Sequence, residues 1–241
     1  MDINTQSPLV RLLDTIITKT VEYKKQVLIG AAFALSFSGA VTGYYFYKHN
    51  VQTKAHETFV AALKYYEAPV KTVRDETDFS TLQFTNETEK WTKVEEVFRT
   101  AYENYKNAGL ASTFLVYQSE ALMNLGKHDE AIAALQKSIT LMDNASVADF
   151  FSVKLALMQL DNKLAATKEH GFALLKKIAE SQQSIAQESA LYYLGGYFWS
   201  QKKYPEAQNY WKQLLLKFDN NPKVPSIYAE QVKNKLSLIT L

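Results

Sequence analysis

The longest hydrophobic run of the chain covers residues 26–47 and contains no charged residue. A helix rises about 1.5 Å per residue, so this run is long enough to cross a hydrocarbon core of roughly 30 Å. A buried core helix is the alternative, but the run is too long for one, and its end at residues 44–47 is wholly aromatic, as in an interfacial belt. Because 25 residues precede it, more than the short leader of a cleaved signal peptide, we expect an uncleaved transmembrane helix over 26–47.

A second apolar pattern lies in residues 1–25, where Ser7-Pro8 is a typical helix start. The apolar residues that follow recur at helical spacing on one face. They are Leu9, Leu12, Leu13, Ile16 and Ile17. We therefore predict an amphipathic leader helix that lies on a membrane surface, packs on a neighbouring protein or folds back on its own chain.

Two features of the predicted span bear on its contacts and its orientation. Gly39 and Gly43 form a G-x-x-x-G pattern, which can mark a contact with another membrane helix, although glycine is common in membrane spans. Basic residues are slightly more numerous before the span than after it, which favours a cytoplasmic N-terminus. They are Arg11, Lys19, Lys24 and Lys25 before it, and Lys48, Lys54 and Lys64 after it.

Residues 48–241 show helical periodicity almost throughout. The spacing predicts a helix over 51–70 that Pro69 ends, a long loop over 71–86, and an amphipathic helix over 89–105 that is closed by Gly109. Few glycines and prolines, 8 and 5 in 241 residues, also favour an all-α fold.

The second half of the chain repeats itself. Residues 115–135 align without a gap with residues 191–211. The aligned pairs share small residues where two helices would cross closely, and bulky residues where space must be filled. These pairs are Ser119 with Gly195, Ala131 with Ala207, and Leu135 with Trp211.

Both segments resemble the tetratricopeptide repeat, a helix–turn–helix unit. The resemblance implies a third, degenerate unit over 149–180, with helices near 150–160 and 164–179, in which Gly171 and Leu175 take the small and bulky positions. A terminal helix with Ile227, Val232 and Leu236 would cover the end of the stack. The expected domain over 48–241 is thus a short α-solenoid of about four helical hairpins.

A narrower resemblance rests on the whole arrangement. Basic residues before a single span, Gly39 and Gly43 followed at once by Tyr44 and Tyr45, a helix leaving the membrane, and degenerate repeats resemble the YfgM-type family of bacterial inner-membrane proteins. That family includes an ancillary subunit of the SecYEG translocon, thought to work with periplasmic chaperones. The resemblance implies a single-pass protein with a cytoplasmic N-terminus, a periplasmic repeat domain and protein partners of that kind.

The repeat resemblance also implies a partner-binding groove lined by the first helix of each unit. It places seven residues toward that groove, although aromatic residues at helical spacing are more often core. They are Val116, Glu120, Met123 and Asn124 in one unit and Tyr192, Trp199 and Ser200 in the last.

Charge and composition argue against most other functions. With 27 basic and 25 acidic residues the net charge is +2, too even for a nucleic-acid surface. The absence of cysteine excludes disulfides, thiolate metal sites, a cysteine nucleophile and a lipoprotein anchor. The four histidines show no metal-ligand spacing, and no nucleotide-binding or catalytic motif is present. We expect no enzyme, no cofactor and no metal.

The leading hypothesis is a membrane-anchored scaffold for protein–protein interaction, in contact with membrane lipid and protein partners. Two alternatives share the same fold. In one, the repeats face the cytoplasm and recruit soluble partners to the membrane. In the other, the chain forms homo-oligomers through its Gly39/Gly43 face and the ends of its repeat stack.

Overall fold

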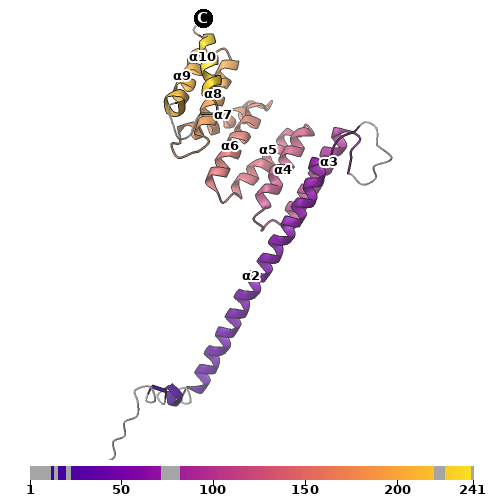
Figure 1. Cartoon of the computed structure of the whole chain (residues 1–241), viewed down its shortest axis with the longest axis vertical. Helices are drawn as coiled ribbons and strands as arrows, with labels where there is room; N and C mark the ends of the chain where they lie inside the picture. Colours follow the sequence, from indigo (N-terminus) through magenta and orange to yellow (C-terminus); the bar gives the residue numbers. More distant parts are fainter. Residues whose placement is uncertain (1–11, 14–15, 20–22, 72–81, 220–225, 240–241) are drawn as a thin grey trace, which may run out of the picture. The chain divides into compact units, whose positions relative to one another are not determined.

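The computed structural model describes residues 12–13, 16–19, 23–71, 82–219 and 226–239 (Figure 1). Over these residues the chain is all-α and arranged in helical hairpins, as the sequence predicts. It divides into two compact units, Met1–Thr53 and Lys54–Leu241. Helix α2 (Lys24–Glu67) begins in the first unit and ends in the second.

The first unit holds the two segments for which the sequence predicts membrane contact. Residues 12–13 and 16–19 are helical, with Leu12, Leu13, Ile16 and Ile17 exposed, whereas the predicted helix start at Ser7-Pro8 and Leu9 lies outside the described residues. Among the residues described, no helix is both long and apolar enough to cross a membrane. Within α2, the side chains of residues 24, 27, 30 and 31 are not among those that the structure describes.

The second unit consists of successive hairpins followed by a terminal helix. The end of α2 pairs with α3 (Glu87–Asn104), α4 (Ala111–Asn124) with α5 (His128–Thr140), α6 (Ala145–Leu160) with α7 (Ala165–Glu180), and α8 (Gln187–Ser200) with α9 (Tyr204–Leu214). A π-helical turn, η1 (Leu215–Asp219), extends α9, and α10 (Ala229–Ile239) follows. The predicted helices over 150–160 and 164–179 are therefore confirmed as α6 and α7.

One kind of joint connects the hairpins. The second helix of each hairpin packs against the first helix of the next, so α3 lies on α4, α5 on α6 and α7 on α8, and α10 packs on α9 and η1. This regular joint places successive hairpins in a row.

Small residues bring the two helices of a hairpin close together at the predicted positions. Ser119 is buried and its hydroxyl donates to the carbonyl oxygen of Ala131 at 2.7 Å. A Cβ added to Gly171 would lie only 2.6 Å from the carbonyl oxygen of Ala156, and one added to Gly195 would meet the indole of Trp211. The small positions assigned from the sequence are thus confirmed in all three hairpins.

The turns of the two aligned repeats share an unusual backbone conformation. Gly126 has φ of 74°, and Lys202, its aligned counterpart, has φ of 62°. Glycine adopts this left-handed region at little cost, whereas a lysine is strained there. The last hairpin therefore has the same turn as the α4/α5 hairpin, with lysine in place of glycine.

The first hairpin has a long connection whose ends are paired. Val70 and Phe84 form a parallel bridge, in which the Lys71 N–H donates to the Phe84 oxygen at 2.9 Å and the Phe84 N–H donates to the Pro69 oxygen at 3.1 Å. Helix α2 ends at Glu67, ahead of Pro69 and three residues earlier than the 51–70 pattern predicts. Of the predicted 71–86 loop, residues 72–81 lie outside the described part.

The terminal helix covers the end of the stack largely as expected. Val232 is fully buried and Leu236 packs against the core around Trp211. Ile227 is 71% exposed, so its prediction as a covering residue is wrong, because it precedes α10 rather than lying on the buried face of that helix.

Candidate functional site: the first-helix face and the α2/α3 groove

The first helices of successive hairpins meet around one carboxylate. The Tyr66 hydroxyl of α2 donates to Glu120 Oε1 of α4 at 2.6 Å, and Lys154 Nζ of α6 lies 3.3 Å from Glu120 Oε2. We call the surface formed by Tyr66, Glu120 and Lys154 the first-helix face. Because its members come from three hairpins, the face is continuous across two joints.

Electrostatics on this face keeps Tyr66 neutral. The hydrogen bond to Glu120, followed by partial burial and the charge of the carboxylate, raises the pKa of Tyr66 to about 12. The Tyr66 ring also packs edge-on against Trp91 and Tyr117, with ring centroids 5.6 and 5.0 Å away. The hydroxyl is therefore a fixed donor at neutral pH, and the ion pair with Lys154 remains open to solvent.

The other α4 residues predicted for the groove divide into two kinds. Val116 and Met123 are half-buried and pack against a hydrophobic cluster shared with α5 and α6. Asn124 is exposed, and its Nδ2 donates to the Glu120 backbone oxygen at 2.9 Å. Of the four predicted α4 residues, Glu120 and Asn124 are thus the ones that present polar groups to solvent.

On α8, the terminal helix already contacts one of the predicted groove residues. The Tyr192 ring stacks on Tyr228 with centroids 4.3 Å apart, and its hydroxyl donates to Gln231 Oε1 at 2.8 Å. Burial and the neighbouring Tyr228 raise the pKa of Tyr193 beside it. Tyr192 therefore attaches the chain's own C-terminal segment.

Trp199 and Ser200 lie at the end of α8. The Trp199 ring is 5.1 Å from Tyr204 and 5.5 Å from Trp211, between centroids, so it is half-buried in the last hairpin. Ser200 is exposed, and its hydroxyl donates to the Tyr197 oxygen of its own helix at 2.8 Å.

The proposed membrane contact residues, Gly39 and Gly43, both lie on α2 in the first unit. A Cβ added to either would meet no atom within 4 Å. They do not take part in the first-helix face.

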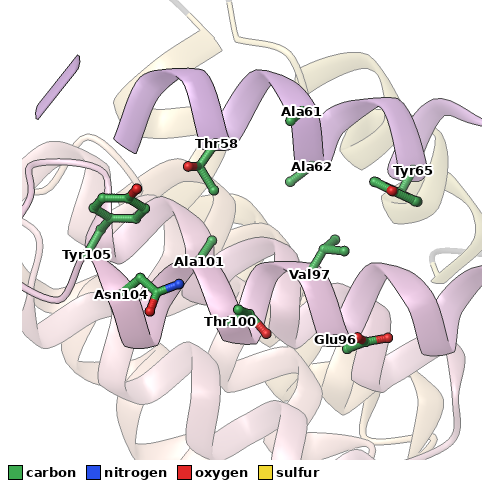
Figure 2. A pocket seen from close by; sticks show the side chains of 10 residues that line it. All are labelled: Thr58, Ala61, Ala62, Tyr65, Glu96, Val97, Thr100, Ala101, Asn104 and Tyr105. Atoms are coloured by element: carbon green, nitrogen blue, oxygen red, sulfur yellow. The ribbon is translucent and has the colours of Figure 1, made fainter. Parts of the chain in front are cut away.

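A groove between α2 and α3, opposite the side on which α4 packs, was not anticipated from the sequence (Figure 2). It encloses about 280 Å³. Its lining comes from both helices and consists of Thr58, Ala61, Ala62, Tyr65, Glu96, Val97, Thr100, Ala101, Asn104 and Tyr105. Small apolar residues on both helices, Ala61 and Ala62 on α2 and Ala101 on α3, could have revealed this groove, because no helical hairpin is predicted before them.

A second hollow continues this groove toward the start of α3. It has a volume of about 470 Å³ and shares Tyr65 and Glu96 with the first. Leu82 and Phe84 from the connection form its far wall. We use the name α2/α3 groove for the two hollows together.

The arrangement offers surfaces for binding. Within the described residues, no group of three or more histidine, cysteine, aspartate or glutamate side chains could hold a metal ion. Sequence reasoning found Glu120 but missed its two partners, because Tyr66 is separated from it by 54 positions in the sequence and Lys154 by 34.

Comparison with known proteins gave no relative from which a function could be read: no protein-family model, no curated protein and no solved structure matches the chain.

Proposed function

We propose that the protein is a membrane-anchored helical-repeat scaffold for protein–protein interaction. The observation that supports it most is the regular joint by which α3, α5 and α7 each pack on the first helix of the next hairpin. Stacks of this kind present extended surfaces, and partners bind to such surfaces rather than to a closed pocket. The first-helix face and the α2/α3 groove are surfaces of this type.

Assignment of the repeats to the tetratricopeptide type belongs to this proposal. Three features support it: the close crossing at Ser119 and Ala131, the equivalent crossing at Gly195, and the left-handed turn shared by Gly126 and Lys202.

The membrane anchor is proposed from the sequence. The run over 26–47 has the length, the lack of charge and the terminal aromatic residues of a single span, although the described residues alone include no helix that is long and apolar enough. We propose that the N-terminus is cytoplasmic and the hairpins lie outside a bacterial inner membrane. There, as in the YfgM-type family, the protein would assist the translocon together with envelope chaperones.

Protease accessibility of the full chain in intact spheroplasts, with a tag after Leu241, tests the orientation. Digestion of the hairpins without lysis is the expected result. Protection until lysis would contradict the periplasmic assignment and favour a cytoplasm-facing adaptor. Recovery of the chain in the soluble fraction after cell breakage would contradict the anchor itself.

Site-specific photo-crosslinking tests the scaffold. A benzophenone side chain at Asn124, beside Glu120, should give adducts with a defined protein, whereas one at Gln136, exposed on α5, serves as the matched control. Equal adducts from both positions, or none from either, would count against partner binding on the first-helix face.

A further inference from the structure

Among the residues that the structure describes, the face of the first hairpin toward the N-terminal end of the stack lacks the helix that covers the corresponding face elsewhere. In the later hairpins, α4 is covered by α3, α6 by α5 and α8 by α7. Within the described part of the second unit, no helix takes that place on α2, and the α2/α3 groove opens there instead. The vacant position is thus equivalent to one that the chain itself fills with a helix at every later joint.

We propose that the α2/α3 groove is the docking site for an amphipathic α-helix of a partner protein, which extends the stack by one helix. This rests on the proposed scaffold function and names the surface and the kind of partner. Helix-in-groove recognition of this type uses apolar side chains at i, i+3 or i+4 and i+7.

The floor of the groove is built for close approach. Ala62 and Ala101 form its deepest part, with exposed fractions of 3% and 1%, while Ala61 and Val97 stand at its sides. Figure 2 shows Tyr105 at one end of this part and Tyr65 at the other, with Thr58, Thr100 and Asn104 between. Small side chains in the floor leave room for the large apolar side chains of an incoming helix.

The length of the groove matches a helix of the chain's own kind. Along α3 its lining extends from Thr88 to Tyr105, which at about 1.5 Å per residue is roughly 25 Å. The helices that pack at the later joints have similar lengths: α5 has 13 residues and α7 has 16. A partner helix of comparable length would fill both hollows.

The chemistry of the partner helix follows from the helices that fill the equivalent position. The buried residues of α5, which packs on α4 as well as on α6, are Ala131, Ile132, Ala134, Leu135 and Ser138, and those of α7, which packs on α6 as well as on α8, are Gly171, Leu175, Ile178 and Ala179. Both helices place basic residues in their last turn and polar residues outside. We therefore expect leucine, isoleucine and alanine on the docking face.

The charged residues in the lining, Glu89, Lys93 and Glu96, are already hydrogen-bonded within the hairpin: Glu89 accepts from Thr85, and Lys93 pairs with Glu96. Lys93 Nζ lies 2.9 Å from Glu96 Oε2, and this hydrogen bond lowers the pKa of the Glu96 carboxyl, so the pair stays ionised at neutral pH. Surface pairs of this kind contribute little energy. Docking should accordingly depend on apolar contact and only weakly on salt.

Two other occupants are less suited. A second copy would have to offer an uncovered amphipathic helix, but α3, α5, α7 and α9 bury their apolar faces within their own stack. The chain's own residues 1–25 precede the proposed span, which would place them across the membrane from the groove.

Photo-crosslinking in cells that produce the full chain identifies the occupant. A benzophenone side chain at Thr100, inside the groove, should give one defined adduct, and mass spectrometry of the crosslinked peptide should place it in an amphipathic helix of another protein. An adduct with a second copy, or with residues 1–25, would overturn the proposal, and so would adducts no different from those of Gln136 on α5.

The direct test uses the crosslinked segment as a synthetic peptide. Ala61→Trp fills the groove and should weaken peptide binding to the full chain by about tenfold or more, as expected when a hot-spot pocket is blocked. Val60→Trp is the matched control, because Val60 adjoins Ala61 on α2 but is 58% exposed and outside the lining. Equal binding by the two variants would refute the site. Circular dichroism of both checks that the fold is intact.

The two proposals can fail separately. Adducts from Asn124 on the first-helix face together with none from Thr100 would remove the groove and leave the scaffold function standing. The absence of adducts from both positions would remove both.

Discussion

The two ends of the hairpin stack differ in how they are closed. At the C-terminal end, α10 and the preceding Tyr228 cover the last hairpin: Val232 is fully buried, Tyr228 stacks on Tyr192, and Lys235 lies over Trp211 with its Nζ 5.6 Å from the ring centroid. At the N-terminal end, the described residues place a helix on one side of the first hairpin only. The α2/α3 groove lies on its other side.

The aromatic residues of the two end hairpins show the same difference. In the first hairpin, Phe59 and Phe98 pack into the joint with α4, where they and Tyr117 lie within 6.2 Å of one another between ring centroids, whereas Tyr65 lines the groove. In the last hairpin, Tyr192 and Trp211 also contact the C-terminal segment, through Tyr228 and Lys235 respectively. The helix that covers the C-terminal end adds buried side chains to the core. The uncovered N-terminal end instead leaves a surface on which another molecule can pack.

The largest expected effect comes from emptying the core at the covered end. Trp211 and Phe98 are both fully buried, so Trp211→Ala and Phe98→Ala should each lower the free energy of unfolding by about 3–5 kcal/mol. Only Trp211→Ala should also loosen α10. Urea titration measures the first effect and amide hydrogen exchange of α10 the second; equal exchange of α10 in both variants would contradict the difference between the ends.

A smaller effect should follow from adding one methyl group to the same hairpin. Gly195→Ala forces a Cβ against the Trp211 indole, which is held by its N–H donating to the Tyr192 oxygen at 3.1 Å. Overpacking of this kind costs about 1–3 kcal/mol, offset by up to about 1 kcal/mol of helix propensity.

Gly196 is the matched control for that change. A Cβ there meets no atom within 4 Å, so Gly196→Ala should stabilise the chain by up to about 1 kcal/mol. The difference in unfolding midpoint between the two variants measures the crowding. If both variants were stabilised alike, close packing at Gly195 would be disproved.

These packing positions were the part of the fold that the sequence predicted best. The spacing of small and bulky residues is a local property, and it located Ser119, Gly171 and Gly195 and the helices around them. The degenerate unit over 149–180 was found in the same way, with Leu175 fully buried as its bulky residue.

Contacts between distant residues could not be predicted from such spacing. The hydrogen bond from Tyr66 to Glu120 depends on how two hairpins pack, and the bridge between Val70 and Phe84 depends on how the two ends of a loop meet. The α2/α3 groove was missed for a related reason, because an uncovered face has no partner pattern in the sequence. Tyr192 was predicted to face a partner, but it packs on Tyr228, which lies 36 positions further along the chain, just before α10.

At the uncovered end, a moderate effect is expected from the cap of α3. Asn86, the N-cap, accepts from the Glu89 N–H through Oδ1 at 2.8 Å, and Glu89 Oε2 accepts from the N–H of the preceding Thr85 at 3.0 Å, an arrangement similar to a capping box. Asn86→Ala should therefore cost about 1 kcal/mol of unfolding free energy. It should raise hydrogen exchange in the first turn of α3 and leave α8 to α10 unchanged.

Asn144→Ala, at the start of α6, provides the comparison within the middle of the stack. Its Oδ1 accepts from the Ser146 and Val147 N–H groups, so a similar loss is expected. If Asn86→Ala raised exchange throughout the stack, the two ends would be more tightly coupled than their packing indicates.

The smallest expected effect on stability at neutral pH concerns Tyr66. Its pKa is about 12 in the folded chain against 10.0 for an unperturbed tyrosine, chiefly because its hydroxyl donates to Glu120. Its contribution to stability is therefore complete below pH 10 and is lost as the pH rises from 10 toward 12, where the unfolded chain ionises first. In Glu120→Gln the negative acceptor is removed, so the pKa of Tyr66 should fall toward 10.

Ultraviolet titration of the folded chain follows this ionisation directly. Glu120→Gln should advance the titration of one tyrosine and flatten the loss of stability between pH 10 and 12, while Lys154→Met, which removes only the exposed ion pair, should leave Tyr66 donating to the carboxylate. Glu120 of α4 accepts from Tyr66 of α2, so it links the first two hairpins. A smaller loss of stability between pH 10 and 12 in Glu120→Gln would show that this hydrogen bond holds the uncovered hairpin to the rest of the stack. An unchanged tyrosine titration would show that Tyr66 does not hold Glu120 in solution, and the first-helix face would then lack its link to α2.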